Sequence, residues 1–259
     1  RQRQMCIRDR SSCIKRIEES PTLAITAKAL KLKSEGRDII GLAAGEPDFD
    51  TPEFIKEAAI KAIKSGFTKY TEVSGMPSLK SAIVEKFKNE NGLDFRTDEV
   101  IVGVGGKQCI FNLCLALLEP DDEVIIPAPY WVSYTDIVQL TGAKPVIIQC
   151  GIEQLFKMTP KQLSSVISKN TKLIFLNSPS NPTGAVYSKT ELRDLADILL
   201  DHPHVFIGTD DIYEHISLDE TAFNNILMIE PKLKSQVVIL NGVSKAYSMT
   251  GWRIGYAAG

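Results

Sequence analysis

Short apolar runs alternate with amphipathic stretches along the carboxyl-terminal 160 or so residues of this 259-residue chain. Runs of this kind are typical of strands that are covered on both faces. Seven such runs, separated by helical stretches, predict a three-layer α/β/α fold around a mainly parallel seven-stranded sheet. The predicted strands cover residues 100–104, 123–126, 145–148, 173–176, 205–209, 237–240 and 254–257.

The first hundred residues show a helical pattern instead. Apolar spacing predicts helices over residues 21–36, 53–65 and 77–90. Thr51 is expected to cap the second of these helices, because Pro52 follows it and suits a first helical position. Before that helix, the segment GEPDFDTP is rich in turn formers and predicts a loop.

Composition places the chain among ordinary globular proteins, with 44% hydrophobic and 24% charged residues. A net charge of −2 gives no reason to expect nucleic acid or an acidic membrane surface as a partner. Five cysteines without a CxxC pair predict reduced thiols and a cytoplasmic protein. We expect no metal site, since His202 and His204 flank a proline in a connecting segment.

The polar residues of the carboxyl-terminal part gather where predicted strands end. They occupy residues 105–106, 127–131, 177–184, 210–213 and 244–245. Ligands of open α/β sheets bind outside the carboxyl ends of the strands. The sequence therefore predicts a site along this one edge of the sheet.

An anion site is suggested by VGVGGKQ, in which a strand passes through glycines into a helix. Backbone N–H groups of Gly106 and Lys107 could face a phosphate there. Gln108 follows the lysine, so the Ser or Thr that holds Mg²⁺ in a Walker loop is missing, and the third glycine of a dinucleotide fingerprint is missing too. A plain tight turn is the alternative.

Asp210 and Asp211 end a strand of small and apolar residues. A carboxylate buried there needs a cationic partner, and a protonated pyridine nitrogen would be one. For Asp211 the better interpretation is the cap of a following helix. Tyr213 could hydrogen-bond a phenolate in the same pocket, or be an ordinary half-buried tyrosine.

Four further side chains have a chemical and a structural interpretation. Asn181 could be a neutral donor to a ring oxygen, or simply part of a loop. Trp131 could stack on an aromatic ring, or be a structural tryptophan. Lys245 can attack a carbonyl carbon and Arg253 can hold a phosphate, although both residue types are more often solvated charges or ion-pair partners. Together they suit a phosphorylated aldehyde.

In their order and spacing, these segments resemble the fold type I, class I pyridoxal-phosphate aminotransferases, and they are most similar to the bacterial aspartate aminotransferases. The residues that carry the resemblance run from Gly45 to Gly259. They are GEPDFDTP, KYTEVSGMPSL, VGVGGKQ, PAPYWVSY, NSPSNPTG, TDDIYEH and SKAYSMTGWRIGYAAG.

The resemblance implies pyridoxal 5′-phosphate as the cofactor and assigns roles around its ring. Lys245 would form the Schiff base, and Asp210 would hold the pyridinium nitrogen. Tyr213 and Asn181 would share the ring oxygen, and Trp131 would stack on the ring.

It also assigns the groups around the cofactor phosphate and the substrate. The phosphate would be held by Gly105, Gly106, Lys107, Ser244 and Arg253. Tyr70 would reach the phosphate bound in the other subunit, which implies a homodimer. Gly45, Trp131 and Asn181 would lie beside the substrate carboxylate.

The implied activity is a ping-pong transamination between an L-amino acid, expected to be aspartate, and a 2-oxo acid such as 2-oxoglutarate or oxaloacetate. Lys245 would move a proton from the substrate α-carbon to the cofactor. Alternatives are an aromatic or prephenate aminotransferase, a carbon–sulfur lyase with the same cofactor residues, or a fragment that binds the cofactor without catalysis. A regulator with a DNA-binding module and a nicotinamide-dependent dehydrogenase fit less well.

The resemblance also predicts how the chain divides. The leader, residues 1–12, is expected to be non-native or disordered, since RQRQMCIRDR shows no periodicity. Residues 13–48 would form an amino-terminal arm and part of a small domain, and residues 49–259 the large cofactor-binding domain.

Two departures from the family are apparent. Its substrate-clamping arginine lies beyond the lysine segment in a carboxyl-terminal domain, so this chain alone is expected to be inactive or nearly so. Some close relatives that also accept prephenate have a lysine just before the SxT segment, where this chain has Glu18 and Glu19, which weakens the expected dicarboxylate preference.

Overall fold

The computed structural model describes residues 11–17, 21–42, 45–218 and 222–259. Most of the expected leader, together with Glu18 and Glu19, lies outside the described residues. Among the helices that are described, none is long and apolar enough to cross a membrane. The described cysteines, which are Cys13, Cys109, Cys114 and Cys150, are free thiols.

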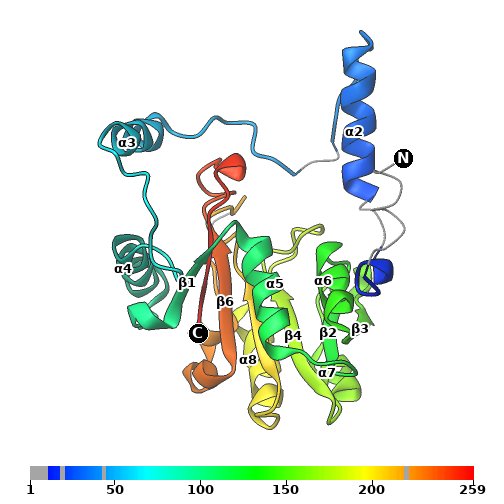
Figure 1. The fold of residues 1–259 in the computed structure, drawn as a ribbon. Coiled ribbons are helices and arrows are strands. Elements are labelled where there is room, and N and C mark those ends of the chain that lie inside the picture. The colour runs from blue at the N-terminus through cyan, green and yellow to red at the C-terminus, as the bar shows by residue number, and fades with distance from the viewer. Residues whose placement is uncertain (1–10, 18–20, 43–44, 219–221) are drawn as a thin grey trace.

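A seven-stranded sheet forms the centre of the structure, as the apolar runs predicted (Figure 1). Its strand order is β1-β7-β6-β5-β4-β2-β3, and β7 alone runs antiparallel to its neighbours β1 and β6. All other strands therefore end at one edge. The strands are β1 (Val100–Gly103), β2 (Glu123–Ala128), β3 (Lys144–Gln149), β4 (Thr171–Asn177), β5 (Phe206–Asp210), β6 (Val237–Gly242) and β7 (Gly255–Ala258).

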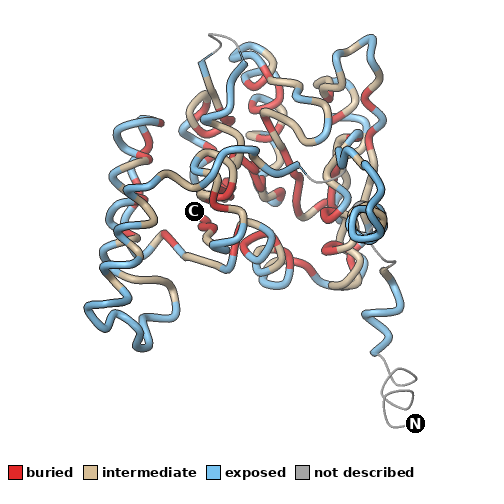
Figure 2. Tube along the Cα trace, turned by 90° about the horizontal axis from the view of Figure 1, so that it is seen from above, coloured by how far each residue is buried: buried red, intermediate tan, exposed pale blue. Residues whose placement is uncertain are grey.

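Helices cover both faces of the sheet and create two hydrophobic clusters. One face packs against α5 (Gly106–Leu117) and α6 (Ser133–Thr141). Alternating residues of β4 show the division, since Phe175 belongs to the α5–α6 side and Ile174 to the opposite side. In Figure 2 the buried residues gather in the middle of the molecule. The opposite face packs against α4 (Pro77–Lys86), α7 (Pro160–Val166), α8 (Lys189–Leu200) and α9 (Ile226–Ile229).

The amino-terminal helices stand outside these layers (Figure 1). They are α2 (Pro21–Ser34) and α3 (Glu53–Lys64), and α3 has no buried residue. Short helical turns complete the described structure. They are η1 (Ile14–Arg16), η2 (Phe87–Asn91), η3 (Thr97–Glu99), η4 (Ile152–Gln154), η5 (Pro231–Ser235) and η6 (Thr250–Trp252).

Two local expectations were wrong, and one expected helix differs in type over its last turn. Thr51 does not cap α3, because its hydroxyl instead donates to the carbonyl oxygen of Ser248 at 2.6 Å. The helix expected over residues 77–90 changes at Lys86 into the π-helix η2, which ends at Gly92 with a left-handed φ of 66°. The residues after Asp211 form turns, so Asp211 caps no helix there.

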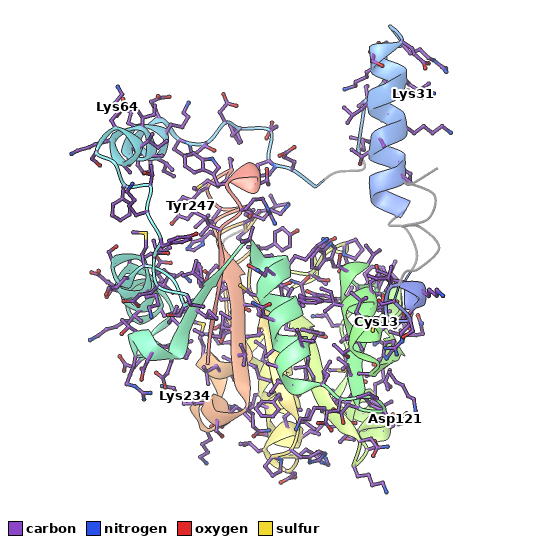
Figure 3. The ribbon with its side chains drawn as sticks, in the orientation of Figure 1. Cys13, Lys31, Lys64, Asp121, Lys234 and Tyr247 are labelled. Atoms are coloured by element: carbon purple, nitrogen blue, oxygen red, sulfur yellow. The ribbon has the colours of Figure 1, made fainter. Side chains whose placement is uncertain are left out.

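The carboxyl edge of the sheet can be located in Figure 3. Tyr247, which follows β6, lies at the upper end of the sheet, whereas Asp121 and Lys234, which precede β2 and β6, lie at the lower end. The segments that were predicted to form the site all leave the sheet at the upper edge.

Candidate functional site

Lys245 lies in the turn that follows β6. Its ammonium donates to the carbonyl oxygen of Gly45 and lies 5.9 Å from the centre of the Tyr213 ring. Burial lowers the pKa of Lys245, and the nearby carboxylate of Glu46 opposes that shift. A lysine with a lowered pKa has more of the neutral amine that attacks carbonyl carbon.

Asp210 is a buried carboxyl group at the end of β5. The hydroxyl of Tyr134 donates to its Oδ2 at 2.6 Å. Burial raises the pKa of Asp210 to about 6, although the hydrogen bond from Tyr134 acts in the opposite direction. The backbone N–H of Ile212 donates to the carboxylate as well. The remaining acceptor capacity, in a poorly solvated place, suits a cationic ring nitrogen.

Asp211 is buried as well, but both of its carboxylate oxygens are engaged by neighbouring side chains. Thr209 donates to Oδ1 at 2.6 Å, and Asn225 donates to Oδ2 at 2.7 Å. Asn225 is also the N-cap of α9, so Asp211 ties this helix to the end of β5. Burial raises the pKa of Asp211 to about 8. Of the two carboxyl groups, Asp210 is therefore the better partner for a ligand.

The ends of β4 and β5 are joined through two asparagines. Asn177 donates to the backbone oxygen of Asp210 at 2.8 Å and accepts from the backbone N–H of Asn181 at 2.6 Å. Asn181 in turn shares a side-chain hydrogen bond with Tyr213. Burial raises the pKa of Tyr213, so the phenol stays protonated and can donate at neutral pH.

Trp131 lies just before α6, between the buried Tyr134 and α5. Its ring meets that of Tyr134 edge to face at 5.5 Å, and the ammonium of Lys107 lies 4.9 Å from the Trp131 ring centre. Tyr134 also stacks on Phe175 at 4.8 Å. These contacts link α5, α6 and Asp210 through aromatic rings.

The turn from β1 into α5 forms a cradle, a space beside Gly105 and Gly106 that is open because these residues and Gly255 have no side chains. Gly105 has a φ of 80°, and a Cβ there would come within 2.3 Å of Nη2 of Arg253. A Cβ on Gly255 would come within 2.3 Å of the backbone of Gly105 and Gly106. The glycines thus bring a guanidinium group up to the amino-terminal end of α5, where backbone N–H groups favour an anion. Ser244 is buried just before Lys245.

A loop from the amino-terminal half lies against the lysine segment. The hydroxyl of Thr250 donates to the carboxylate of Glu46, and Nε1 of Trp252 donates to the hydroxyl of Thr51 at 3.0 Å. These bonds hold Gly45 beside Lys245.

The structure thus brings the sequence-predicted residues to one edge of the sheet, except Tyr70, whose side chain is fully exposed. Sequence reasoning missed Tyr134, Asn177 and Glu46. Tyr134 follows Trp131 by three residues, a spacing that could have marked it as a second aromatic residue on the same side. Glu46 and Asn177 lie within motifs of which only neighbouring residues were singled out.

These groups fit pyridoxal 5′-phosphate. A phosphate matches the glycine cradle with Arg253, a pyridinium nitrogen matches buried Asp210, and an aldehyde matches the half-buried amine of Lys245. The three groups leave from β1, β5 and β6, so the sheet sets their spacing.

Comparison with known proteins shows the family of the chain. The family model "Aminotransferase class I and II" matches residues 37–259. The chain is 59% identical to the aspartate/prephenate aminotransferase of Nitrosomonas europaea over 249 residues, which cover 96% of this chain and 63% of the relative. A relative of the same name from Cereibacter sphaeroides is 55% identical, with 96% and 62% covered.

Solved structures are similar too. The aspartate aminotransferase of Rhizobium meliloti superimposes with a TM-score of 0.93 at 51% identity, covering 97% of this chain and 63% of that one. The enzyme of Thermus thermophilus with maleate gives a TM-score of 0.92 at 45% identity, covering 97% and 64%. The chain thus spans somewhat less than two thirds of the length of these proteins.

Proposed function

This chain belongs to the class I and II aminotransferases, and from that premise we propose that it binds pyridoxal 5′-phosphate through Lys245 and serves transamination of an L-amino acid with a 2-oxo acid. The observation that carries the proposal is the half-buried Lys245 beside Tyr213, at the same sheet edge as buried Asp210. When bound, the cofactor supplies an electron sink for the carbanion formed at the substrate α-carbon.

The side chains divide the work of holding the cofactor. Gly105, Gly106, Lys107, Ser244 and Arg253 surround the phosphate. Asp210 keeps the ring nitrogen protonated, because a carboxylate in a buried place favours a neighbouring cation. Tyr213 and Asn181 donate to the ring oxygen, and Trp131 covers a face of the ring.

Lys245 also acts as the acid and base of the reaction. As a free amine, Lys245 would take a proton from the substrate α-carbon and hold it for return in the second half of the transfer. The lowered pKa of Lys245 suits this role, because a base works best when its pKa lies near the operating pH.

We infer aspartate as the amino acid, with 2-oxoglutarate or oxaloacetate as the 2-oxo acid. The names of the relatives support aspartate and add prephenate as a second substrate. Maleate in the Thermus thermophilus structure is a dicarboxylate, like these substrates. Gly45, Trp131 and Asn181 would lie beside the substrate carboxylate. Product analysis with aspartate as the amino donor and prephenate as the amino acceptor tests these two activities. A cysteine conjugate offered as the substrate tests for a carbon–sulfur lyase.

We also propose a cytoplasmic homodimer in which Tyr70 contacts the phosphate bound by the other subunit. The full exposure of Tyr70 supports a role outside its own chain. The proposed division gives an amino-terminal arm and part of a small domain over residues 13–48, and a large domain over residues 49–259. The position of α2 outside the sheet layers supports the arm, although α3, which the division assigns to the large domain, stands outside them too (Figure 1).

The direct test is borohydride reduction of the chain after incubation with pyridoxal phosphate, followed by peptide mass mapping. We expect one dominant adduct on Lys245 and its loss in Lys245→Arg. Labelling scattered over surface lysines, with no preference for Lys245, would contradict the proposal.

A further inference from the structure

Glu214, directly after Tyr213, is a carboxylate that the proposed reaction does not use. Its side chain is only 4% exposed, and three side chains donate to it. The ammonium of Lys86 and the amide of Asn241 donate to Oε1, the latter at 2.6 Å, and the amide of Asn91 donates to Oε2 at 3.0 Å. These donors come from the end of α4, the end of β6 and the π-helix η2.

One carboxylate thereby joins the two segments that carry Tyr213 and Lys245. Asn241 lies four residues before Lys245, and its Oδ1 accepts from the backbone N–H of Gly242 at 2.7 Å. Asn241 is therefore fixed to its own strand end while its amide reaches across to Glu214. Both side chains are buried, so this bond is shielded from competing water.

Lys86 supplies the positive charge that this buried carboxylate needs. Its ammonium also donates to Oδ1 of Asn91 at 2.8 Å and lies 3.8 Å from Glu90. Glu90, Glu214 and His215 have ligand types that suit a metal ion and lie close together. However, the Lys86 ammonium already contacts both glutamates, so the cation at this place is the lysine.

We infer that Glu214 is a positioning residue, which holds Tyr213 at a fixed place relative to Lys245 through Asn241, Asn91 and Lys86. The inference rests on the proposed function for the roles of Tyr213 and Lys245. Its physical basis is that a fully satisfied buried polar network specifies one arrangement of the segments that it joins.

The variant that tests the inference is Glu214→Gln, which keeps the size of the side chain. Donors approach both carboxylate oxygens, so an amide must turn its own NH₂ toward one of them, and at least one bond is lost. Lys86 keeps Asn91 and Glu90 as partners, and we therefore expect the variant to fold.

Glu191→Gln is the control for the chemical change. Glu191 pairs with Lys157 at 2.6 Å, and the Lys157 side chain is 14% exposed, as is that of Lys86, whereas the Glu191 side chain is 39% exposed and that of Glu214 is 4% exposed. The control makes the same chemical change at the start of α8, away from the site, and glutamine can still complete the capping box there.

The first readout needs no cofactor. The pKa of Lys245 is measured from the pH dependence of its acylation by acetic anhydride, with peptide mass mapping. In Glu214→Gln we expect this pKa to rise toward the ordinary 10.5, because the loosened segment admits water to a lysine whose pKa burial had lowered. In Glu191→Gln it should equal the wild-type value.

The second readout is borohydride trapping with pyridoxal phosphate. We expect the preference for Lys245 over surface lysines to fall by about tenfold or more in Glu214→Gln, since small displacements of a reacting group are costly. The control should keep the wild-type preference. A Glu214→Gln chain with wild-type pKa and wild-type labelling would overturn the inference.

A second variant covers the case in which Glu214→Gln does not fold. Lys86→Met combined with Glu214→Gln removes both charges and leaves neither one buried alone. A wild-type pKa of Lys245 in this folded double variant would also overturn the inference. If wild-type chain shows no preferred labelling of Lys245, the proposed function fails, yet the acylation readout still decides whether Glu214 positions the lysine.

Discussion

Adjacent carboxyl groups with different surroundings have different uses in this chain. Asp210 and Asp211 are both buried, and burial raises the pKa of each. Asp211 accepts from the side chains of Thr209 and Asn225, whereas Asp210 accepts from the side chain of Tyr134 and from the backbone N–H of Ile212. A buried carboxylate destabilises the fold unless a cation or enough hydrogen bonds compensate its charge. The buried carboxylate of Asp210, which suits a cationic ligand, is therefore expected to lower the stability of the chain when no such ligand is bound.

The pH dependence of stability tests this conclusion. The pKa of Asp210 is about 6 in the folded chain and 3.8 ordinarily, so the folded state binds this proton more tightly. The resulting stabilisation is fully present below pH 3.8 and is lost as the pH rises through about 6. A shift of about two units corresponds to about 3 kcal/mol.

We therefore expect Asp210→Asn, without cofactor, to be more stable than wild type by up to about 3 kcal/mol at pH 8 and no more stable at pH 3.5. Urea unfolding at both pH values measures the difference. Subtracting the wild-type curve removes most of the titration of Asp211, whose pKa is raised mainly by burial and only to a lesser extent by the charge of Asp210. A gain that is equal at both pH values would show that Asp210 is not the titrating group.

At the scale of elements, the site depends on how closely β7 approaches the start of α5. Gly255 pairs with Gly103 and Gly242 on the two neighbouring strands and lies against the backbone of Gly105 and Gly106. Only a residue without a side chain allows this approach. The close approach of β7 also brings Arg253, which lies just before this strand, to the cradle. Gly255 therefore permits both the packing of β7 and the formation of the anion site.

Gly255→Ala should consequently be a severe substitution. Its Cβ would lie 2.3 Å from backbone atoms, which cannot rotate away as a side chain can. We expect the free energy of unfolding to fall by about 3 kcal/mol, at the upper end of overpacking effects. Gly251→Ala is the control, because a Cβ there meets nothing within 4 Å. Equal stability of the two variants, measured by urea unfolding, would contradict the close approach.

Elements were easier to predict from sequence than their contacts. Each apolar run became a strand, because strands covered on both faces need such runs wherever they lie in the sheet. Thr51 has the sequence of a cap, but its hydroxyl donates instead to the backbone oxygen of Ser248, 197 positions away. The bond from Tyr134 to Asp210 spans 76 positions. Local patterns carry no information on partners at such distances, and the family resemblance supplied the cofactor roles.

At the scale of the whole molecule, the sheet and its helices bury their apolar residues, whereas α3 does not. Phe54, Ile60 and Ile63 of α3 are all exposed. Isolated helices of about 12 residues are marginal in water. A short amphipathic helix with exposed apolar side chains indicates a partner surface, and a second copy of the chain is the partner that the proposed homodimer provides.

Hydrogen exchange at two chain concentrations tests this arrangement. If a second copy covers α3, protection of its amides should increase with concentration, while that of α5, which packs on the sheet, should stay constant. Ile63→Ser should abolish the increase and shift sedimentation toward the monomer. Ile152→Ser is the matched control, since the two isoleucines are 66% and 72% exposed and Ile152 lies in η4, in another part of the chain. If protection of α3 is the same at both concentrations, α3 is not at the interface between subunits. If both variants weaken association equally, surface hydrophobicity in general, rather than this helix, holds the two copies together.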